Sequence, residues 1–349
     1  MITIENIKLN SIDSEIDKFA LGDPYSLFYT STSFAKLISH CLNVDVFFLV
    51  AKKNKKIAGY LPYVVKDGPF GSVYNSFAYY GSNGGVVQVQ EDIDSKLSLI
   101  NAYYSIAENS GAASATIITN PLRKDFEVYE KNIKYSHKDE RIGQVTHLPK
   151  NVSESELLAL YDNPRPRNIR KAIREGIKIE FKKNKEALDF IYKTHAANIR
   201  AIGGIAKEKF FFDNVPRLLD QKDWGVYLAT LNGKAVAGLL VFYFNKTVEY
   251  FTPVIVDEFR AIQPLSLIIY KAMYLSGIQG YENWNWGGTW LSQSGVYDFK
   301  KKWYTTEYRY YYYSIIYKEK ILMKSKDEIL KYYPNFYLIP FSSLQNRSL

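Results

Sequence analysis

The chain has 349 residues, of which 47% are hydrophobic and 23% are charged, and its formal net charge is +9. This length and composition predict roughly two folded domains and exclude an intrinsically disordered or fibrous protein. The positive charge favours anionic partners, such as RNA, nucleotide cofactors, nucleotide-linked sugars or an acidic membrane surface, without choosing among them.

No segment of the sequence predicts export, membrane insertion or metal binding. No apolar run approaches the roughly 18 residues needed to span a bilayer, and the N-terminal stretch lacks the order of a signal peptide. The single cysteine, Cys41, rules out an intramolecular disulfide, and the four histidines have no metal-ligand spacing. We therefore expect a cytoplasmic protein without a metal.

In chain order, the first clear elements form a β-hairpin that occurs again in the second half. The stretch "FFLVAKKNKKIAGYLPY" (47–63) aligns without gaps with "VYLATLNGKAVAGLLVF" (226–242). Each contains an apolar strand, a turn and a second apolar strand that carries an Ala-Gly pair, at Ala58-Gly59 and Ala237-Gly238. Both stretches predict a hairpin.

A helix follows each hairpin, and a short strand follows each helix. The segments "LSLINAYYSIAENSG" (97–111) and "LSLIIYKAMYLSG" (265–277) open identically and end in glycine, which predicts helices with glycine stops. The strands are expected at 114–119 and 281–286. The first copy is longer, and we expect "KDGPFGSVYNS" (66–76) to hold its extra residues as a loop. The repeated order of hairpin, further strand, helix and strand indicates a duplication.

The boundary between the copies is expected near "LPKNVSESELLALYDNPRPRN" (148–168). Ser153 and Glu156 have the spacing of a capping box, and two prolines interrupt the chain. The sequence therefore predicts a first domain over 1–148 and a second over 149–320. The tail, 321–349, is expected to form a short helix and a strap.

The duplicated unit resembles the GNAT acyltransferase fold. Two such units in tandem resemble the arrangement of the FemABX family. "RPRNIRKAIREGIKIEF" (165–181) is similar to the segment that opens the family's second domain. "PYSLFYTSTSFAKLI" (24–38) and "IAGYLPYV" (57–64) are similar to its early helix and strand. The run at 285–303 is similar to its closing signature, which is matched by Gly287, Gly288, Gly295, Tyr297, Phe299 and Lys300. The resemblance implies an α/β fold of two tandem GNAT-like domains, with mixed central sheets flanked by helices.

The resemblance also implies an activity. Family members transfer an acyl or aminoacyl group to an amine on a cell-envelope precursor or a related small molecule. The first hypothesis is transfer from acyl-CoA to a nucleotide-linked or lipid-linked sugar precursor. The second is transfer from aminoacyl-tRNA to a peptidoglycan precursor. The third is a non-catalytic protein that binds anionic glycan or RNA. A monomer or a homodimer fits each hypothesis.

In a GNAT domain the pyrophosphate of the donor lies on backbone N–H groups at the start of the central helix. The usual Arg/Gln-x-x-Gly-x-Gly/Ala sequence is "RAIQPLS" (260–266) here, without either glycine and with a proline that has no N–H. This departure argues against ordinary acetyl-CoA binding. The cofactor-binding residues that the resemblance implies are Arg260, Gln263, Ser266, Gly287 and Gly288. The two glycines either allow close approach of a substrate or only form a turn.

A basic ridge is expected on the helix that opens the second domain. At about 100° per residue, four basic side chains fall within one arc, away from Ile169, Ala172 and Ile173. The ridge consists of Arg167, Arg170, Lys171 and Arg174. It is either a solvated helix face or a substrate-binding surface that holds a diphosphate or an RNA backbone.

The residues expected to take part in catalysis are Lys300, Glu249, Tyr250 and Asp298. Lys300 follows Phe299 in the closing signature and could stabilise an oxyanion or a donor phosphate. In the run of three lysines, it could also be solvated charge. Glu249 and Asp298 are the acidic candidates for proton acceptor, and Tyr250 points to the opposite face of its strand from Glu249. No Ser/His/Asp or Cys/His pattern competes for the chemistry.

Overall fold

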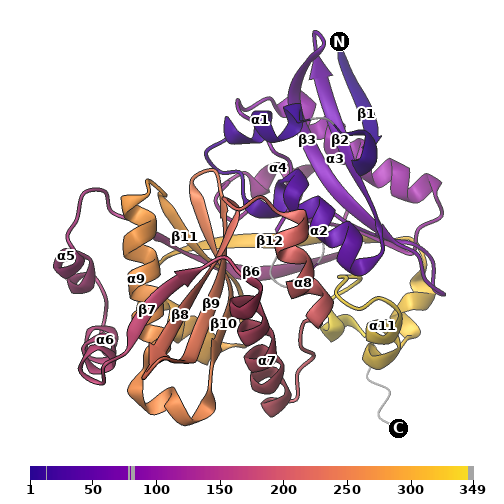
Figure 1. The fold of residues 1–349 in the computed structure, drawn as a ribbon. Coiled ribbons are helices and arrows are strands. Elements are labelled where there is room, and N and C mark those ends of the chain that lie inside the picture. The colour runs from indigo at the N-terminus through magenta and orange to yellow at the C-terminus, as the bar shows by residue number, and fades with distance from the viewer. Residues whose placement is uncertain (13, 78, 80–82, 345–349) are drawn as a thin grey trace. The chain divides into compact units, whose positions relative to one another are not determined.

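The computed structural model describes residues 1–12, 14–77, 79 and 83–344, and the chain divides into two compact units (Figure 1). Unit 1 comprises Met1–Arg141 and the chain from Arg309 onward, and unit 2 comprises Ile142–Tyr308. The chain passes between the units within strands β6 (His137–His147) and β12 (Thr306–Ile316).

These units differ from the expected boundaries after 148 and 320, because the chain returns to unit 1 at Arg309. The reason is strand pairing. Tyr312–Ile316 of β12 pair antiparallel with β5 (Ser114–Ile118), which the sequence pattern of the tail does not reveal.

Within unit 1 the strand order is β1-β2-β3-β4-β5-β12, with both antiparallel and parallel pairs. Its remaining strands are β1 (Ile2–Lys8), β2 (Asp45–Lys53), β3 (Lys56–Lys66) and β4 (Val73–Asn75). Its helices are α1 (Glu15–Leu21), α2 (Thr32–Leu42), α3 (Ile93–Asn109), α4 (Phe126–Asn132) and α11 (Lys326–Tyr332). Alternate residues of the hairpin reach opposite layers, since Leu49 and Leu61 pack in one core with Leu99 of α3, whereas Tyr60 contacts Phe19 of α1.

Unit 2 has the strand order β6-β11-β10-β9-β8-β7. Its further strands are β7 (Lys178–Lys182), β8 (Trp224–Leu231), β9 (Lys234–Phe244), β10 (Thr247–Ile255) and β11 (Asn283–Trp290). Its helices are α5 (Glu154–Ala159), α6 (Arg165–Arg174), α7 (Lys185–Ala201), α8 (Lys209–Leu218), α9 (Pro264–Ile278) and α10 (Ser294–Lys301), with a 3-10 helix, η3 (Asp257–Ile262), before α9.

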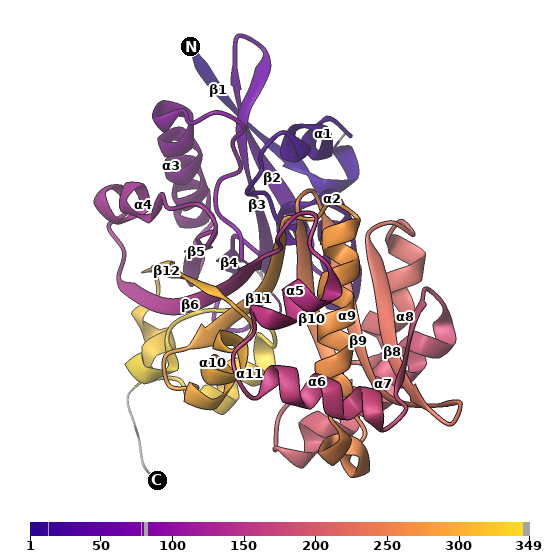
Figure 2. The same cartoon turned by 90° about the vertical axis from the view of Figure 1, so that its left-hand side faces the viewer.

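Helices cover both faces of the sheet in unit 2 (Figure 2). Along β9, Leu239 and Val241 belong to the core that includes α9. Gly238 points the other way, where an added Cβ would lie 2.7 Å from Cδ1 of Ile191 on α7. Glycine at this position therefore allows α7 to pack close to the sheet.

The predicted order of hairpin, strand, helix and strand occurs once in each unit, as β2-β3-β4-α3-β5 and β8-β9-β10-α9-β11. β4 runs parallel to β5, and β10 runs parallel to β11. Both hairpins turn through two residues with positive φ, Asn54 (53°) and Lys55 (64°) in unit 1, and Asn232 (51°) and Gly233 (77°) in unit 2. Such turns match the twist of the strands. The prediction of two mixed α/β units is confirmed.

Two details of the prediction were wrong, and the bounds of one expected strand differ. The expected loop at 66–76 contains β4, and the longer connection of the first copy lies between β4 and α3. The strand expected at 281–286 is β11, which begins at Asn283 and extends to Trp290. Gly277 lies inside α9, and the glycine with left-handed backbone after this helix is Gly280, at φ 90°. A single glycine is tolerated within a helix, so its position in the sequence does not fix the helix end.

The capping box of Ser153 and Glu156 is confirmed at α5.

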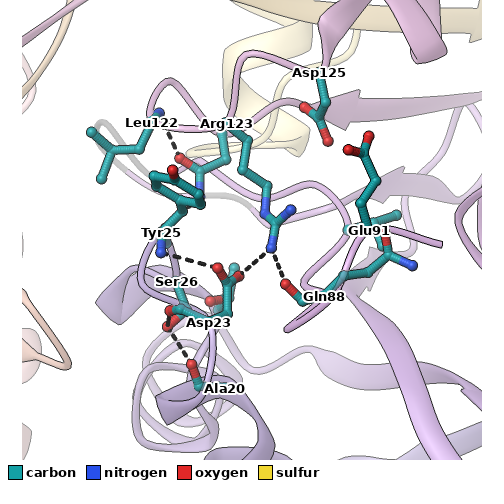
Figure 3. A network of polar contacts seen from close by, with 12 residues as sticks. Ala20, Asp23, Tyr25, Ser26, Gln88, Glu91, Leu122, Arg123 and Asp125 are labelled. Carbon is teal, nitrogen blue, oxygen red and sulfur yellow. Dashed lines mark hydrogen bonds and ion pairs between the residues drawn. The ribbon is translucent and has the colours of Figure 1, made fainter. Parts of the chain in front are cut away.

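A buried polar network in unit 1 joins the segment after α1 to the segment after β5 (Figure 3). Nη2 of Arg123 lies 2.8 Å from Oδ2 of Asp23, whose side chain is 1% exposed. The same guanidinium donates to the carbonyl oxygen of Gln88, and the backbone N–H of Tyr25 donates to Oδ1 of Asp23 at 3.0 Å. One buried ion pair therefore fixes two loops of unit 1.

Over the described ranges, no helix is both long and apolar enough to cross a membrane. The same part of the chain has no cluster of three or more His, Cys, Asp or Glu side chains placed to hold a metal ion.

Candidate functional site

The two central parallel strands of unit 2 separate partway along their length. β10 and β11 are paired from Thr247↔Asn283 to Glu249↔Asn285. β10 then continues to Ile255 and β11 to Trp290 without further pairing to each other in this fully described region. Facing backbone N–H and C=O groups in such an opening can bind an extended ligand in the manner of an added strand. We call this feature the β10–β11 opening.

Polar side chains close the narrow end of the opening. Glu249 is fully buried, and Nδ2 of Asn285 donates to its Oε2 at 2.8 Å. The Oδ1 atom of Asn285 accepts from the backbone N–H of Gly287 at 2.9 Å. Gly287 has φ 71°, in the left-handed region that favours glycine. Asn285 is therefore held from both sides, and glycine at 287 has a backbone reason.

Aromatic side chains line the opposite face. The ring centroids of Tyr250 and Trp286 are 4.8 Å apart, and those of Trp286 and Phe299 are 6.2 Å apart. Burial raises the pKa of Tyr250 far above its usual value, so its hydroxyl stays protonated. Tyr250 and Glu249 lie on opposite faces, as the strand alternation predicts.

Lys300, on α10, contacts the part of β11 that lies beyond its pairing with β10. Its side chain is buried, and Nζ donates to Oγ1 of Thr289 at 2.9 Å and to the carbonyl oxygens of Gly288 at 3.2 Å and Gly287 at 3.4 Å. No carboxylate of the described chain forms an ion pair with it. Burial lowers the pKa of Lys300 to about 8. Lys301 is exposed, so the description of the lysine run as solvated charge fits Lys301 and not Lys300.

The start of α9 keeps an unusual backbone without the glycines of the GNAT pattern. Gln263 has φ 63° and ψ 37°, the left-handed conformation in which glycine is common, and its Nε2 donates to the carbonyl oxygen of Arg260 at 3.0 Å. Pro264 occupies the first helical position, and Ser266 is buried in the first turn. Arg260 itself is exposed and paired with Asp257 at 2.5 Å. Because proline has no N–H, the first turn of α9 offers one backbone donor fewer to a ligand.

The basic ridge lies on α6, which packs against α9 and η3. Arg167, Arg170 and Arg174 are exposed, and Lys171 is half-buried. None of the four forms an ion pair with the described residues. Ile173, which was expected on the far side of the ridge, is 53% exposed. The ridge is thus a cationic surface close to the start of the central helix.

Replacing Arg167, Arg170 and Arg174 together with Gln should weaken the binding of an anionic donor and leave the melting temperature nearly unchanged. The reason is that exposed charges contribute little to folding. Titration of the triple variant with a CoA ester or tRNA, beside a thermal melt, measures both quantities. Unchanged affinity would make the ridge a solvated helix face.

The structure does not bring Asp298 to the other expected residues. Asp298 is exposed on α10, whereas Lys300, two residues later, is buried. Residues two apart on a helix do not face each other. Glu249 and Tyr250 lie on β10, Gly287 and Gly288 lie on β11, and Lys300 contacts both glycines.

Sequence reasoning missed Arg165, at the first position of α6. Its guanidinium carbon lies 4.3 Å from the ring centroid of Phe299 and 5.5 Å from that of Trp303, and the residue is 8% exposed. The signal was present, because Arg165 shares the i, i+4, i+7 spacing of the buried residues Ile169 and Ala172. Asn285 and Thr289, which position Glu249 and Lys300, gave no such signal.

The corresponding helix start in unit 1 is acidic. Asp92 caps α3 and accepts hydrogen bonds from the N–H of Ser95 at 3.3 Å and from its hydroxyl at 3.0 Å. The pKa of Asp92 is lowered, mainly by its hydrogen bond with Lys53. Glu91 and Asp94 flank it in a depression of about 600 Å³. Carboxylates at this position repel a phosphate that the helix N-terminus would otherwise attract.

Comparison with known proteins agrees with this architecture. Residues 165–301 match the family model described as an acetyltransferase (GNAT) domain. The fold is similar to that of FemX, with a TM-score of 0.71 and 14% identity over 91% of this chain and 98% of that one. A tandem GNAT protein of the clavulanic acid biosynthesis pathway is similar at a TM-score of 0.53 and 11% identity, over 90% and 98% of the two chains.

A third similar structure is the C-terminal domain of a putative lysylphosphatidylglycerol synthetase from Agrobacterium fabrum, with a TM-score of 0.53 and 11% identity over 81% of this chain and 88% of that one. No curated protein sequence matches the chain. The tandem α/β units, the opening in unit 2 and the matched acetyltransferase domain support the prediction of an N-acyltransferase. The comparisons show that residues 165–301 match a GNAT acetyltransferase domain and that the chain has the fold seen in FemX and in the tandem GNAT protein.

Proposed function

We propose that unit 2 transfers an acyl group to the amine of a cell-envelope or polysaccharide precursor, with the reacting carbonyl in the β10–β11 opening. The observation that carries the proposal is the buried ammonium of Lys300 beside the strand edge at Gly287 and Gly288. A buried cation without a carboxylate partner stabilises negative charge that forms next to it more strongly than a solvated one does.

The transfer needs few groups from the protein. The acceptor amine attacks the carbonyl carbon, the C–N bond forms, and the carbonyl oxygen becomes an oxyanion that accepts a hydrogen bond from Lys300. The two longer contacts of Nζ, to the carbonyl oxygens of Gly288 and Gly287, are the ones that the oxyanion replaces. The bond to the leaving thiolate or ribose oxygen then breaks, and the proton of the amine passes through Glu249 or solvent to the leaving group.

Acyl-CoA is the first candidate donor, because GNAT domains place its pyrophosphate at the start of the helix that corresponds to α9. The start of α9 in unit 2 lacks the carboxylates found at α3 and lies beside the basic ridge. Aminoacyl-tRNA is the second candidate. Pro264 and the side chain of Gln263 favour it, since they leave a poorer cradle for a pyrophosphate.

The acceptor is proposed to be a nucleotide-linked or lipid-linked sugar precursor, with the reaction in the cytoplasm. Acetyl-CoA and charged tRNA, each mixed with amine-bearing nucleotide sugars and a peptidoglycan precursor, test the proposal. We expect amide formation with one donor. Binding of both substrate classes without amide formation would instead favour a non-catalytic binding protein.

The pKa of Lys300, about 8, predicts a pH dependence. The ammonium form stabilises the oxyanion, so its contribution is complete well below pH 8 and is lost as the pH rises through that value. Because this pKa belongs to the ligand-free protein, we expect kcat/KM to fall above about pH 8. In a Lys300→Arg variant, whose side chain stays protonated, the fall should move to higher pH. A wild-type kcat/KM that stays constant from pH 7 to 10 would contradict the role of Lys300.

A further inference from the structure

Arg165 is a buried cation whose charge the described chain does not balance. It is 8% exposed, and no carboxylate of the described residues forms an ion pair with it. Arg123 differs in this respect, because its guanidinium lies 2.8 Å from the buried carboxylate of Asp23. An isolated buried charge is costly, so such a side chain usually has a counter-ion.

The hydrogen-bonding groups of Arg165 are also largely unused. Its guanidinium stacks over Phe299, which occupies its face and leaves the N–H groups in the plane. Nη2 donates to the carbonyl oxygen of Phe299 at 3.4 Å, a long contact. Nε is buried, and no atom of the described protein accepts a hydrogen bond from it.

The surroundings place this guanidinium next to the transfer site. Phe299, over which the guanidinium stacks, has its ring centroid 6.2 Å from that of Trp286, and the ring of Trp286 lies 4.8 Å from that of Tyr250. Arg165 also opens α6, whose exposed face is the basic ridge. Arg165 therefore lies on the buried face of the helix whose exposed face carries the basic ridge.

We propose that Arg165 binds a phosphate group of a substrate, with its face on Phe299 and its in-plane N–H groups donating to two phosphate oxygens. A planar guanidinium suits such two-point recognition, and the aromatic rings fix its orientation. The inference rests on the proposed function only for the source of the phosphate, which either the donor or the nucleotide-linked acceptor carries.

The direct test observes the Nε–H group of Arg165 by NMR in the full-length protein, with the signal assigned through an Arg165→Lys variant. Titration with inorganic phosphate should shift this signal in a saturable manner. Sodium chloride at matched ionic strength and sodium acetate should not do so. Saturation by acetate at lower concentration than phosphate, or no saturation by phosphate, would overturn the proposal.

The variants provide a second readout. Arg165→Lys should weaken phosphate binding about 10- to 100-fold, because hydrogen bonds from a charged group to the anion are lost. Arg170→Gln, on the exposed ridge, is the matched control and should change the affinity much less. Equal affinities in Arg165→Lys and wild type would overturn the proposal. If Arg165→Lys does not fold, the wild-type titration still decides, with the signal assigned through selective labelling.

Coenzyme A and uridine diphosphate distinguish the two sources. The compound that saturates the Arg165 signal at a lower concentration than inorganic phosphate identifies the substrate whose phosphate binds there. Coenzyme A would indicate the donor, and uridine diphosphate would indicate the acceptor. Saturation by phosphate in a protein without transfer activity would remove the proposed function and leave this inference standing. Transfer activity with an unresponsive Arg165 signal would do the reverse.

Discussion

Lys300→Met should lower kcat by roughly 10²- to 10³-fold, the range found when one oxyanion-stabilising group is removed. Methionine fills a similar volume but cannot donate a hydrogen bond to the oxyanion. Acceptor affinity should change much less, because the lost interaction belongs mainly to the transition state. Steady-state kinetics with saturating donor separate the two effects.

The neighbouring lysines supply the controls for this prediction. Lys301 is exposed and Lys302 is half-buried, whereas Lys300 is buried. Lys301→Met and Lys302→Met should therefore retain most of the activity. Small and equal losses at all three positions would mean that the run acts only through its overall charge.

Arg123→Met should lower the free energy of unfolding by about 3–5 kcal/mol, the usual cost of removing one partner of a buried ion pair. The carboxylate of Asp23, whose side chain is 1% exposed, would lose the guanidinium that lies 2.8 Å away. Denaturant unfolding followed by circular dichroism measures the change. The network belongs to unit 1. If the two units unfold in separate steps, we therefore expect only the unfolding step of unit 1 to lose stability.

An exposed ion pair of unit 1 gives the matched control. Lys131 and Glu127 are one helical turn apart on α4, with side chains 73% and 67% exposed. Lys131→Met should change stability by less than about 0.5 kcal/mol. A loss at Arg123 as small as this would show that the buried network is not a main source of stability.

Local patterns predicted much of this fold. The Ala-Gly hairpins and the paired "LSLI" helices fixed the order of elements in both units, because strand and helix periods depend on nearby residues. The return of the chain to unit 1 at Arg309 was not predictable from such local patterns. It depends on the pairing of β12 with β5, which are far apart in the sequence.

The candidate site was predicted in part, and for similar reasons. The closing signature pointed to Lys300 and the two glycines, which lie together, while Asp298 falls on the exposed side of the same helix. The charged face of α6 predicted the basic ridge, whereas Arg165 lies on the buried face of the same helix. Asn285 and Thr289 gain their roles only through contacts with Glu249 and Lys300.

Hydrogen–deuterium exchange with and without donor tests the central claim most directly. With acetyl-CoA or a stable aminoacyl-tRNA analogue, we expect slower exchange along the facing edges of β10 and β11, at 250–255 and 286–290, and at the start of α9. The corresponding part of unit 1, around β4 and the acidic start of α3, should not change. Protection at α3 in place of the β10–β11 opening would contradict the assignment of the transfer site to unit 2.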